Sequence, residues 1–349
     1  MPRSQRRLLL LAPGLLGPVA DPDAVSSLQA AVPPLEDLLR RSERLEEVYR
    51  GRFEAAVFGA FGVGGRELPV AAVSRFGEAD GDTAHVGESG WLRADPVHLR
   101  IDTHSARLFG DYVLRLEPGE AGQLVERLNG HFAADGLRFE APAPGRWYIA
   151  VEDEPRLETY PPHAVAGRNI DAFMPQGDDA GRWRNWMNEA QMLLHDAAVN
   201  DQREHRGALP VNSVWPWGGG RLPPQPLETV PAMVHADDPL TLGLARLAGI
   251  AAQPLAVPLD EREPAAGQTL IVTTEALEPL VHGDFGAWLE AVERVAGQWL
   301  APAQRQLAEG HLESIQLAVD GGSRYRLRGR GHWRPWRRRR PWTDWLEAG

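Results

Sequence analysis

Residues 211–224 read VNSVWPWGGGRLPP, an apolar run that passes directly into three glycines, an arginine and a proline pair. The β-branched and aromatic residues predict a buried strand over Ser213–Trp217, and the glycines and prolines after it predict a loop over 218–226. Glycine amides can approach an anion closely, so this loop is a candidate ligand site; a strand that simply ends in a turn is the alternative. The three glycines are Gly218, Gly219 and Gly220, and Asn212 directly precedes the strand.

Apolar residues spaced three and four apart predict three amphipathic helices, over 121–132, 183–194 and 285–307. The first follows Pro118, a residue that favours the first turn of a helix. Further strand-like runs separate these helices. They are Leu8–Leu11, Val97–Ile101, Tyr112–Leu116, Trp147–Val151, Leu270–Thr274 and Ile315–Val319.

The order of these elements predicts two domains. Residues 97–151 are read as strand, strand, helix, strand, strand, which is typical of a compact α+β unit, whereas the flanks resemble an α/β protein. We therefore expect residues 1–92 and 226–349 to share one mixed sheet flanked by helices, and residues 93–225 to form a smaller inserted α+β domain.

Composition excludes several classes of protein. With 43% hydrophobic residues among 349, the chain is globular, and its net charge of -11 argues against a surface devoted to nucleic acid. It has no cysteine, which excludes disulfides and thiolate metal sites, and all 37 of its basic residues are arginines. No apolar run is long enough to span a bilayer, so we expect a cytoplasmic protein without membrane contact.

Seven segments, taken in order, carry a resemblance. They are PPLEDLLRRS (33–42), DTAH (82–85), VHLRID (97–102), GEAGQLVERLN (119–129), GRWYIAV (145–151), VNDQREHRGALPVNSVWPWGGG (199–220) and HGDFGAWLEAVE (282–293). Together they resemble the archaeal-type cofactor-independent phosphoglycerate mutases of the alkaline phosphatase superfamily. The chain is also similar to a group of shorter bacterial proteins that carry mutase or regulatory-protein labels. The resemblance implies an alkaline-phosphatase-like mixed sheet, a nucleophilic serine and two divalent metals held by Asp and His ligands.

The chain departs from the family at the positions that carry its chemistry. Where the family has a metal-binding Asp after the first strand this sequence has Pro13, and where it has the nucleophile this sequence has Gly81. The resemblance therefore implies no catalytic residue and no metal cofactor here, since neither residue can replace a carboxylate or a hydroxyl. The vestigial metal-ligand candidates are Glu278, His282, Asp320 and His332.

The family's arginine-lined substrate pocket is better preserved. Arg100, Arg146 and Arg203 occupy the matching positions, beside Asn212 and the three glycines. Guanidinium groups bind phosphate and carboxylate through two parallel hydrogen bonds, so the resemblance implies binding of a small phosphorylated or carboxylated metabolite. The alternative is that these arginines are solvated or form surface ion pairs.

We therefore expect a catalytically degenerate relative of the mutases that binds such a metabolite, or a protein partner, in a regulatory role. An active mutase or phosphohydrolase is the first alternative, and it would require a divalent metal, Mn, Mg or Zn. The second alternative is a protein-interaction module. Its contacts would come from the acidic body and the tail HWRPWRRRRPW (332–342), the one segment where nucleic-acid binding is plausible.

Overall fold

The computed structural model divides the chain into two compact units: residues 1–64 with 225–349, here called the core unit, and residues 65–224, the inserted unit. The first boundary falls earlier in the chain than the sequence suggests, because the helix over 70–77 packs on the strands of the inserted unit. The structure describes residues 6–17, 19, 31–45, 52–65, 67–79, 84–102, 105–224, 227, 229–259, 266–319, 323–329 and 341–346.

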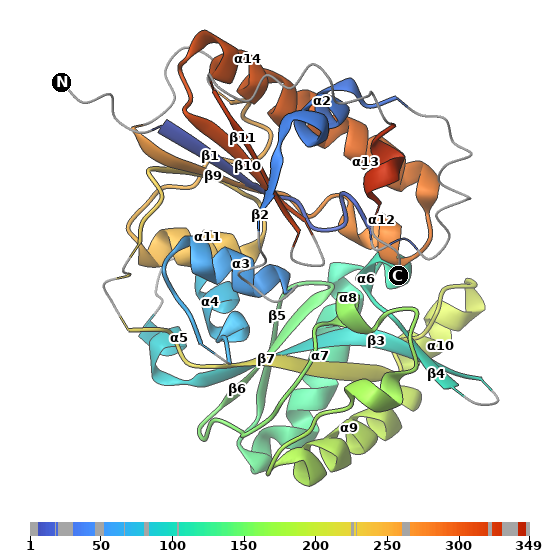
Figure 1. Ribbon diagram of the computed structural model, residues 1–349. Helices are drawn as coiled ribbons and strands as arrows, with labels where there is room; N and C mark the ends of the chain where they lie inside the picture. The colour runs from blue at the N-terminus through green and yellow to red at the C-terminus, as the bar shows by residue number, and fades with distance from the viewer. Residues whose placement is uncertain are drawn as a thin grey trace. The chain divides into compact units, whose positions relative to one another are not determined.

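The core unit contains a six-stranded mixed sheet in the order β2-β11-β10-β1-β9-β8 (Figure 1). Strand β1 runs parallel to both of its neighbours, β8 is parallel to β9, and β11 is antiparallel to β10 and β2. This is the mixed sheet that the sequence predicts. The strands are β1 (Arg6–Leu11), β2 (Glu43–Leu45), β8 (Met233–His235), β9 (Gly267–Val272), β10 (Ser314–Ala318) and β11 (Arg324–Arg328).

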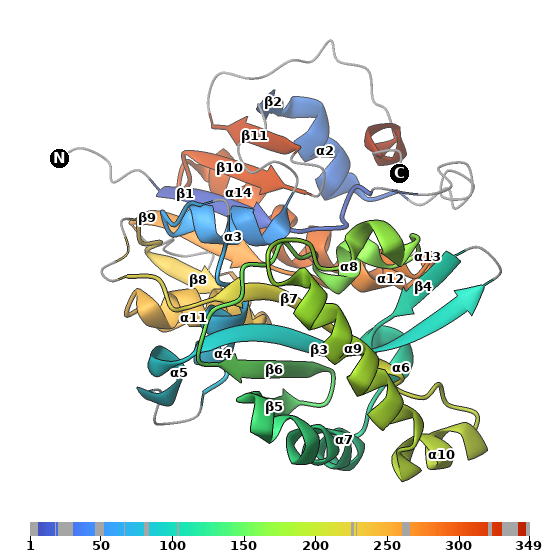
Figure 2. The same cartoon turned by 90° about the horizontal axis from the view of Figure 1, so that it is seen from below.

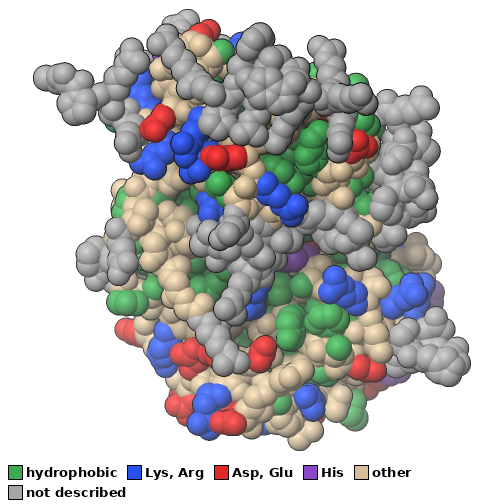
Figure 3. All heavy atoms as spheres, in the orientation of Figure 1, with side chains coloured by type: hydrophobic (Ala, Val, Ile, Leu, Met, Phe, Trp, Pro, Cys, Tyr) green, Lys and Arg blue, Asp and Glu red, His purple; other side chains and the backbone are tan. Residues whose placement is uncertain are grey.

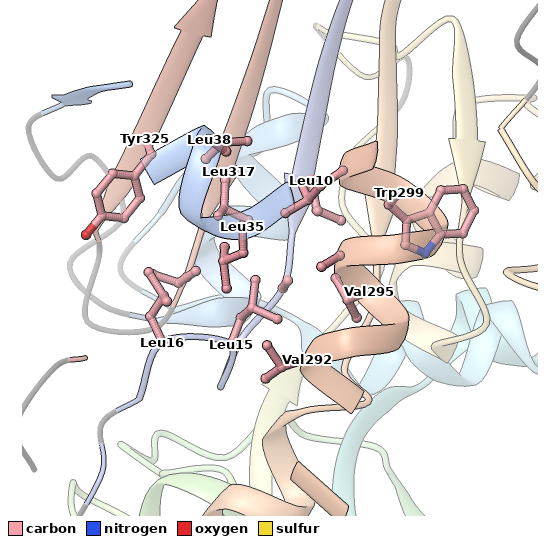
Figure 4. Packing of buried hydrophobic residues seen from close by; sticks show 14 of the residues in the cluster. Leu10, Leu15, Leu16, Leu35, Leu38, Val292, Val295, Trp299, Leu317 and Tyr325 are labelled. Carbon is pink, nitrogen blue, oxygen red and sulfur yellow. The ribbon is translucent and has the colours of Figure 1, made fainter. Parts of the chain in front are cut away.

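Helices cover the core unit's sheet and bury its apolar residues. The predicted helix over 285–307 is confirmed, although a five-residue π-helical turn, η3, interrupts it. Its Val295 and Trp299 pack with Leu10 of β1, Leu35 of α2 and Leu317 of β10 in one buried cluster (Figure 4). The helical elements are α2 (Pro33–Arg41), α3 (Phe53–Ala60), α11 (Pro239–Leu247), α12 (Leu277–Val281), α13 (Phe285–Val295), η3 (Ala296–Leu300), α14 (Ala301–Glu309) and η5 (Trp342–Trp345).

The inserted unit is built on an antiparallel sheet, seen side-on in Figure 2. Its long strand β3 pairs with β6 and β4, and also with β7, while β5 pairs with β6. One sheet face packs against α7 and α9, and the other carries the smaller cluster that includes residues of α4. The strands are β3 (Gly90–Asp102), β4 (Ser105–Phe109), β5 (Arg138–Ala143), β6 (Arg146–Val151) and β7 (Ser213–Gly220).

The helices of this unit include the two stripes predicted over 121–132 and 183–194, found as α7 and α9. Helix α7 begins with a capping box, in which the side chains of Glu117 and Glu120 bond each other's backbone amides. The helical elements are α4 (Val70–Gly77), α5 (Ala84–Glu88), α6 (Asp111–Leu114), α7 (Pro118–Phe132), η1 (Ala133–Asp135), α8 (Pro162–Val165), η2 (Ile170–Phe173), α9 (Ala180–His195) and α10 (Ala198–His205).

Two local predictions were wrong. The run Tyr112–Leu116 is not a strand: it forms the one-turn helix α6, which ends where Arg115 adopts a left-handed conformation with φ of 48°. The second strand of the unit is β4 instead, a few residues earlier. The predicted loop over 218–226 begins too early, because the three glycines continue β7 to Gly220.

The glycines extend β7 because they let it approach its neighbours closely. Gly218 has φ of 63°, and a Cβ placed there would lie 2.9 Å from Cβ of Val70. A Cβ on Gly220 would lie 2.6 Å from Cβ of Pro69, so the entry to α4 lies directly against this end of β7. A residue with a side chain would strain the backbone and clash, which gives the glycines a packing role.

Candidate functional site

Ligands of open α/β sheets bind at the carboxyl ends of the strands, and in the core unit this region begins at the end of β1. There Ala12 and Pro13 are buried, and the next residues, Leu15 and Leu16, belong to the apolar core. The carbonyl of Gly14 accepts the indole N–H of Trp288 at 2.7 Å. Residues 12–16 therefore offer no polar side chain at this strand end, and the loop packs into the apolar core.

The adjacent end of β9 completes this packing. A Cβ on Gly14, which has φ of 77°, would lie 2.8 Å from Cα of Leu277, so the β1 loop and the start of α12 touch through their backbones. Close after this strand end, Glu275 accepts hydrogen bonds from Thr273 at 3.3 Å and from Arg294 at 3.0 Å. An arginine partner competes with any metal for this carboxylate.

The described residues do not fit the two-metal centre that the resemblance implies. They contain no group of three or more His, Asp or Glu side chains placed to hold a metal. The predicted pair Glu278 and His282 does come together across α12, with 3.4 Å between Oε2 and Nε2, and the imidazole is 90% buried. Gly81, Asp320 and His332 lie outside the described residues, as does most of the arginine-rich tail.

Among the predicted pocket arginines, Arg203 is fully buried in α10 and directs its guanidinium into the inserted unit. Its Nε donates to the carbonyl of Leu209 at 2.8 Å, Nη1 to Glu120 Oε2 at 2.5 Å and Nη2 to the carbonyl of Leu114 at 2.6 Å. All three nitrogens therefore have internal acceptors. This geometry gives Arg203 a structural role, fastening α10 to the start of α7.

Asn212 is likewise used internally. Its side-chain oxygen accepts the amide of Leu99 at 2.7 Å, and its side-chain nitrogen donates to the carbonyl of Leu99 at 2.9 Å. The amide group therefore extends the β3–β7 pairing by one step beyond Ser213. In the triple glycine, the amide of Gly218 donates to Thr159 Oγ1 at 3.1 Å.

The other two arginines are more accessible. Arg100 is exposed on β3, with its guanidinium carbon 5.4 Å from the ring centre of Phe109. Arg146 has 42% of its side chain exposed, and its Nε and Nη2 both bond Glu78 Oε1, at 2.9 and 2.8 Å. The structure thus separates the predicted set: Arg203 and Asn212 are internal, whereas Arg100 and Arg146 reach the surface.

A buried polar cluster on the α4 face of the inserted unit's sheet was missed by sequence reasoning. Arg93 of β3 lies between two rings, with its guanidinium carbon 5.1 Å from the centre of Tyr148 and 5.2 Å from that of Trp217. Its Nε and Nη2 bond Asp95 Oδ1 at 3.0 and 2.6 Å, and Asp95 Oδ2 accepts the Trp217 indole N–H at 2.7 Å. The phenol of Tyr148 donates to Glu78, the acceptor of Arg146.

The cluster has fixed charges at neutral pH. Burial alone would lower the pKa of Arg93, but Asp95, Tyr148 and Glu78 together outweigh it, Asp95 most of all, and raise that pKa above its ordinary value. Burial raises the pKa of the Tyr148 phenol well above its usual range, and the neighbouring Glu78 carboxylate adds to this effect. Arg93 is therefore a permanent cation and Tyr148 a neutral donor.

One signal in the sequence points to this cluster. In WLRADPV (91–97), Arg93 and Asp95 stand two apart in a run that is otherwise apolar, so both project to one face of a strand. A charged pair at alternate positions of a central strand is rare unless the charges are paired. The pattern indicates a buried ion pair, but its aromatic partners lie on two other strands and cannot be found from spacing.

No protein-family model matches the chain, but parts of it are similar to curated phosphoglycerate mutases. A protein of Geobacter sulfurreducens described as a probable 2,3-bisphosphoglycerate-independent phosphoglycerate mutase is 28% identical over 135 residues, 38% of this chain and 33% of that protein. The corresponding mutase of Methanosarcina mazei is 29% identical over 152 residues, 42% of this chain and 38% of the mutase. The matches thus span little more than a third of these relatives' length.

A solved structure from Pyrococcus horikoshii shares the fold. It is 13% identical with a TM-score of 0.53, covering 95% of this chain and 89% of that one. The expected architecture, a mixed sheet flanked by helices with an inserted α+β unit, is confirmed. No helix in the described residues is long and apolar enough to cross a membrane.

Proposed function

Because this chain is a divergent relative of the cofactor-independent phosphoglycerate mutases, we propose that it keeps their fold without their metal-dependent phosphoryl transfer. The observation that carries this proposal is the end of β1. Pro13 stands where the resemblance places a metal-binding Asp, and the loop after it is packed through Gly14 against α12 and Trp288. A metal centre there would require this loop to unpack and a carboxylate to be supplied from elsewhere.

In place of catalysis, we propose a regulatory role in the cytoplasm, through binding of a small phosphorylated or carboxylated metabolite or of a protein partner. Support comes from arginines in the inserted unit that reach the surface, Arg100 and Arg146. The internal hydrogen bonds of Arg203 and Asn212 favour a structural role for those two residues. The three glycines support the proposal less than expected from the sequence, since close packing accounts for two of them.

An active metal-dependent mutase or phosphohydrolase is the second candidate function. The approach of His282 to Glu278 favours it, because a carboxylate and an imidazole together are the beginning of a metal site. A coupled mutase assay and a phosphatase assay, each with Mn²⁺, Mg²⁺ and Zn²⁺, separate the two functions. The proposal predicts no turnover above the rate of a Glu278→Gln/His282→Gln control. Turnover that this double variant abolishes would establish the enzyme.

A further inference from the structure

The arginine–carboxylate pairs on the α4 face of the inserted unit share one arrangement. Asp95 bonds Arg93, and Glu78 bonds Arg146, each through Nε and Nη2 to a single carboxylate oxygen. The second oxygen of each carboxylate accepts from a ring donor, Trp217 or Tyr148. Each carboxylate therefore contacts its arginine along the edge formed by Nε and Nη2.

The Nη1 edge of Arg93 carries no hydrogen bond. Nη1 has no partner among the described residues, and it is not among the fully buried polar atoms that lack one, so part of this atom is accessible to solvent. The side chain is nevertheless 90% buried and held between two rings. A guanidinium fixed in this way presents Nη1 and the outer N–H of Nη2 as a preformed fork, so little conformational entropy is lost when it binds.

Arg146 lies next to this fork. Arg93 pairs in register with Tyr148, and Arg146 precedes Tyr148 by two positions in β6, so both arginines project from the same sheet face as diagonal neighbours. Diagonal Cβ atoms are about 7–8 Å apart, within reach of two long side chains. The second arginine of the pair is thus placed to contact the same small anion.

The other arginines described on this face are also paired with a carboxylate. Arg75 and Arg138 share the carboxylate of Glu140. Nη1 of Arg75, in contrast to that of Arg93, is fully buried without a partner. Elsewhere on the inserted unit, in the face that Figure 3 shows, acidic and arginine side chains are interspersed. An anion would therefore be selected by local geometry more than by a broad positive field.

We propose that Arg93, supported by Arg146, forms an oxyanion-binding site on the α4 face of the inserted unit. Its ligand is a small phosphate or carboxylate group, which accepts two parallel hydrogen bonds from the outer fork of Arg93. This inference rests on the proposed function, because it assigns the metabolite-binding role to a definite site. The main binding residue is then Arg93, which the sequence analysis did not select, and not Arg203 or Asn212.

The test is calorimetric titration of the full chain with inorganic phosphate, and separately with acetate, in buffer containing a chelator. Arg93→Lys keeps the charge that balances Asp95 but removes the fork, and should weaken phosphate binding about tenfold or more. Arg146→Lys should weaken it less. Arg138→Gln is the matched control, since Arg138 lies on the same face with 54% of its side chain exposed, and should change affinity little.

Several outcomes overturn the proposal: no saturable binding of either anion by the wild type, equal affinity in a folded Arg93→Lys variant, or an equal loss in Arg138→Gln. If Arg93→Lys does not fold by circular dichroism, Arg146→Lys decides, and unchanged affinity in that variant refutes the site. Phosphate binding without acetate binding identifies the ligand group as phosphate. Mutase turnover in a separate metal-supplemented assay would refute the proposed function. It would not change the result of the titration, which measures anion binding in the presence of a chelator.

Discussion

Replacing Arg203 with methionine tests whether this arginine fastens the inserted unit internally or serves a ligand. Methionine preserves most of the apolar stem of a side chain that has no exposed surface. The carbonyls of Leu114 and Leu209 would lose their buried donors, and the Glu120 carboxylate would keep Arg206 and the backbone amide of Glu117.

The expected cost follows from these three lost bonds. Removing one partner of a buried ion pair typically destabilises a protein by about 3–5 kcal/mol. Because Arg206 continues to neutralise Glu120, we expect Arg203→Met to fall at the lower end, about 3 kcal/mol. Arg206→Met is the matched control: it bonds the same carboxylate but is half-exposed, so it should cost about 0–1 kcal/mol.

Urea unfolding followed by circular dichroism and tryptophan fluorescence measures both variants. A structural role requires a large fall in the unfolding midpoint for Arg203→Met and a small one for Arg206→Met. If Arg203→Met unfolds within about 1 kcal/mol of the wild type and instead loses phosphate affinity, the internal role is refuted.

Two further predictions concern His235 and Gly218. Burial lowers the pKa of His235 in the folded state, so its contribution to stability is complete above the unfolded value of about 6.5 and is lost as the pH falls below it. His235→Phe, which keeps a ring against Trp299, should flatten the fall in unfolding free energy between neutral pH and mildly acidic pH; an unchanged pH slope contradicts this. Gly218→Ala should destabilise the chain by about 1–3 kcal/mol. Gly136→Ala, which has the same kind of positive φ but open space around it, should cost less; equal costs would show that the approach to Val70 is unimportant.

Elements with a strong apolar pattern were predictable because the pattern reflects burial. The stripe over 285–307 predicts the correct helix because one face is buried, and the run Trp147–Val151 predicts the correct strand because both of its faces are buried. Tyr112–Leu116 has the composition of a strand, but the chain turns at Arg115 before Pro118 starts α7. That turn depends on backbone conformations that apolar composition does not encode.

The candidate site was less predictable because exposure is a tertiary property. Nothing in the sequence distinguishes Arg203, whose acceptors come from distant segments, from Arg100, which reaches solvent. The same holds for Arg93, whose two aromatic neighbours are supplied by β6 and β7. Residue type identifies guanidiniums suited to anions, but only packing decides which of them keep a hydrogen-bonding edge available.

The most direct measurement of the central claim is the metal content of the full chain, determined by mass spectrometry after dialysis against Mn²⁺, Mg²⁺ and Zn²⁺ in turn. With Pro13 at the end of β1 and Glu275 bonded to Arg294, the account predicts less metal than one ion per chain, and no change on replacing Glu278 and His282 with glutamine. One or two tightly held ions per chain, lost in that double variant, would contradict it.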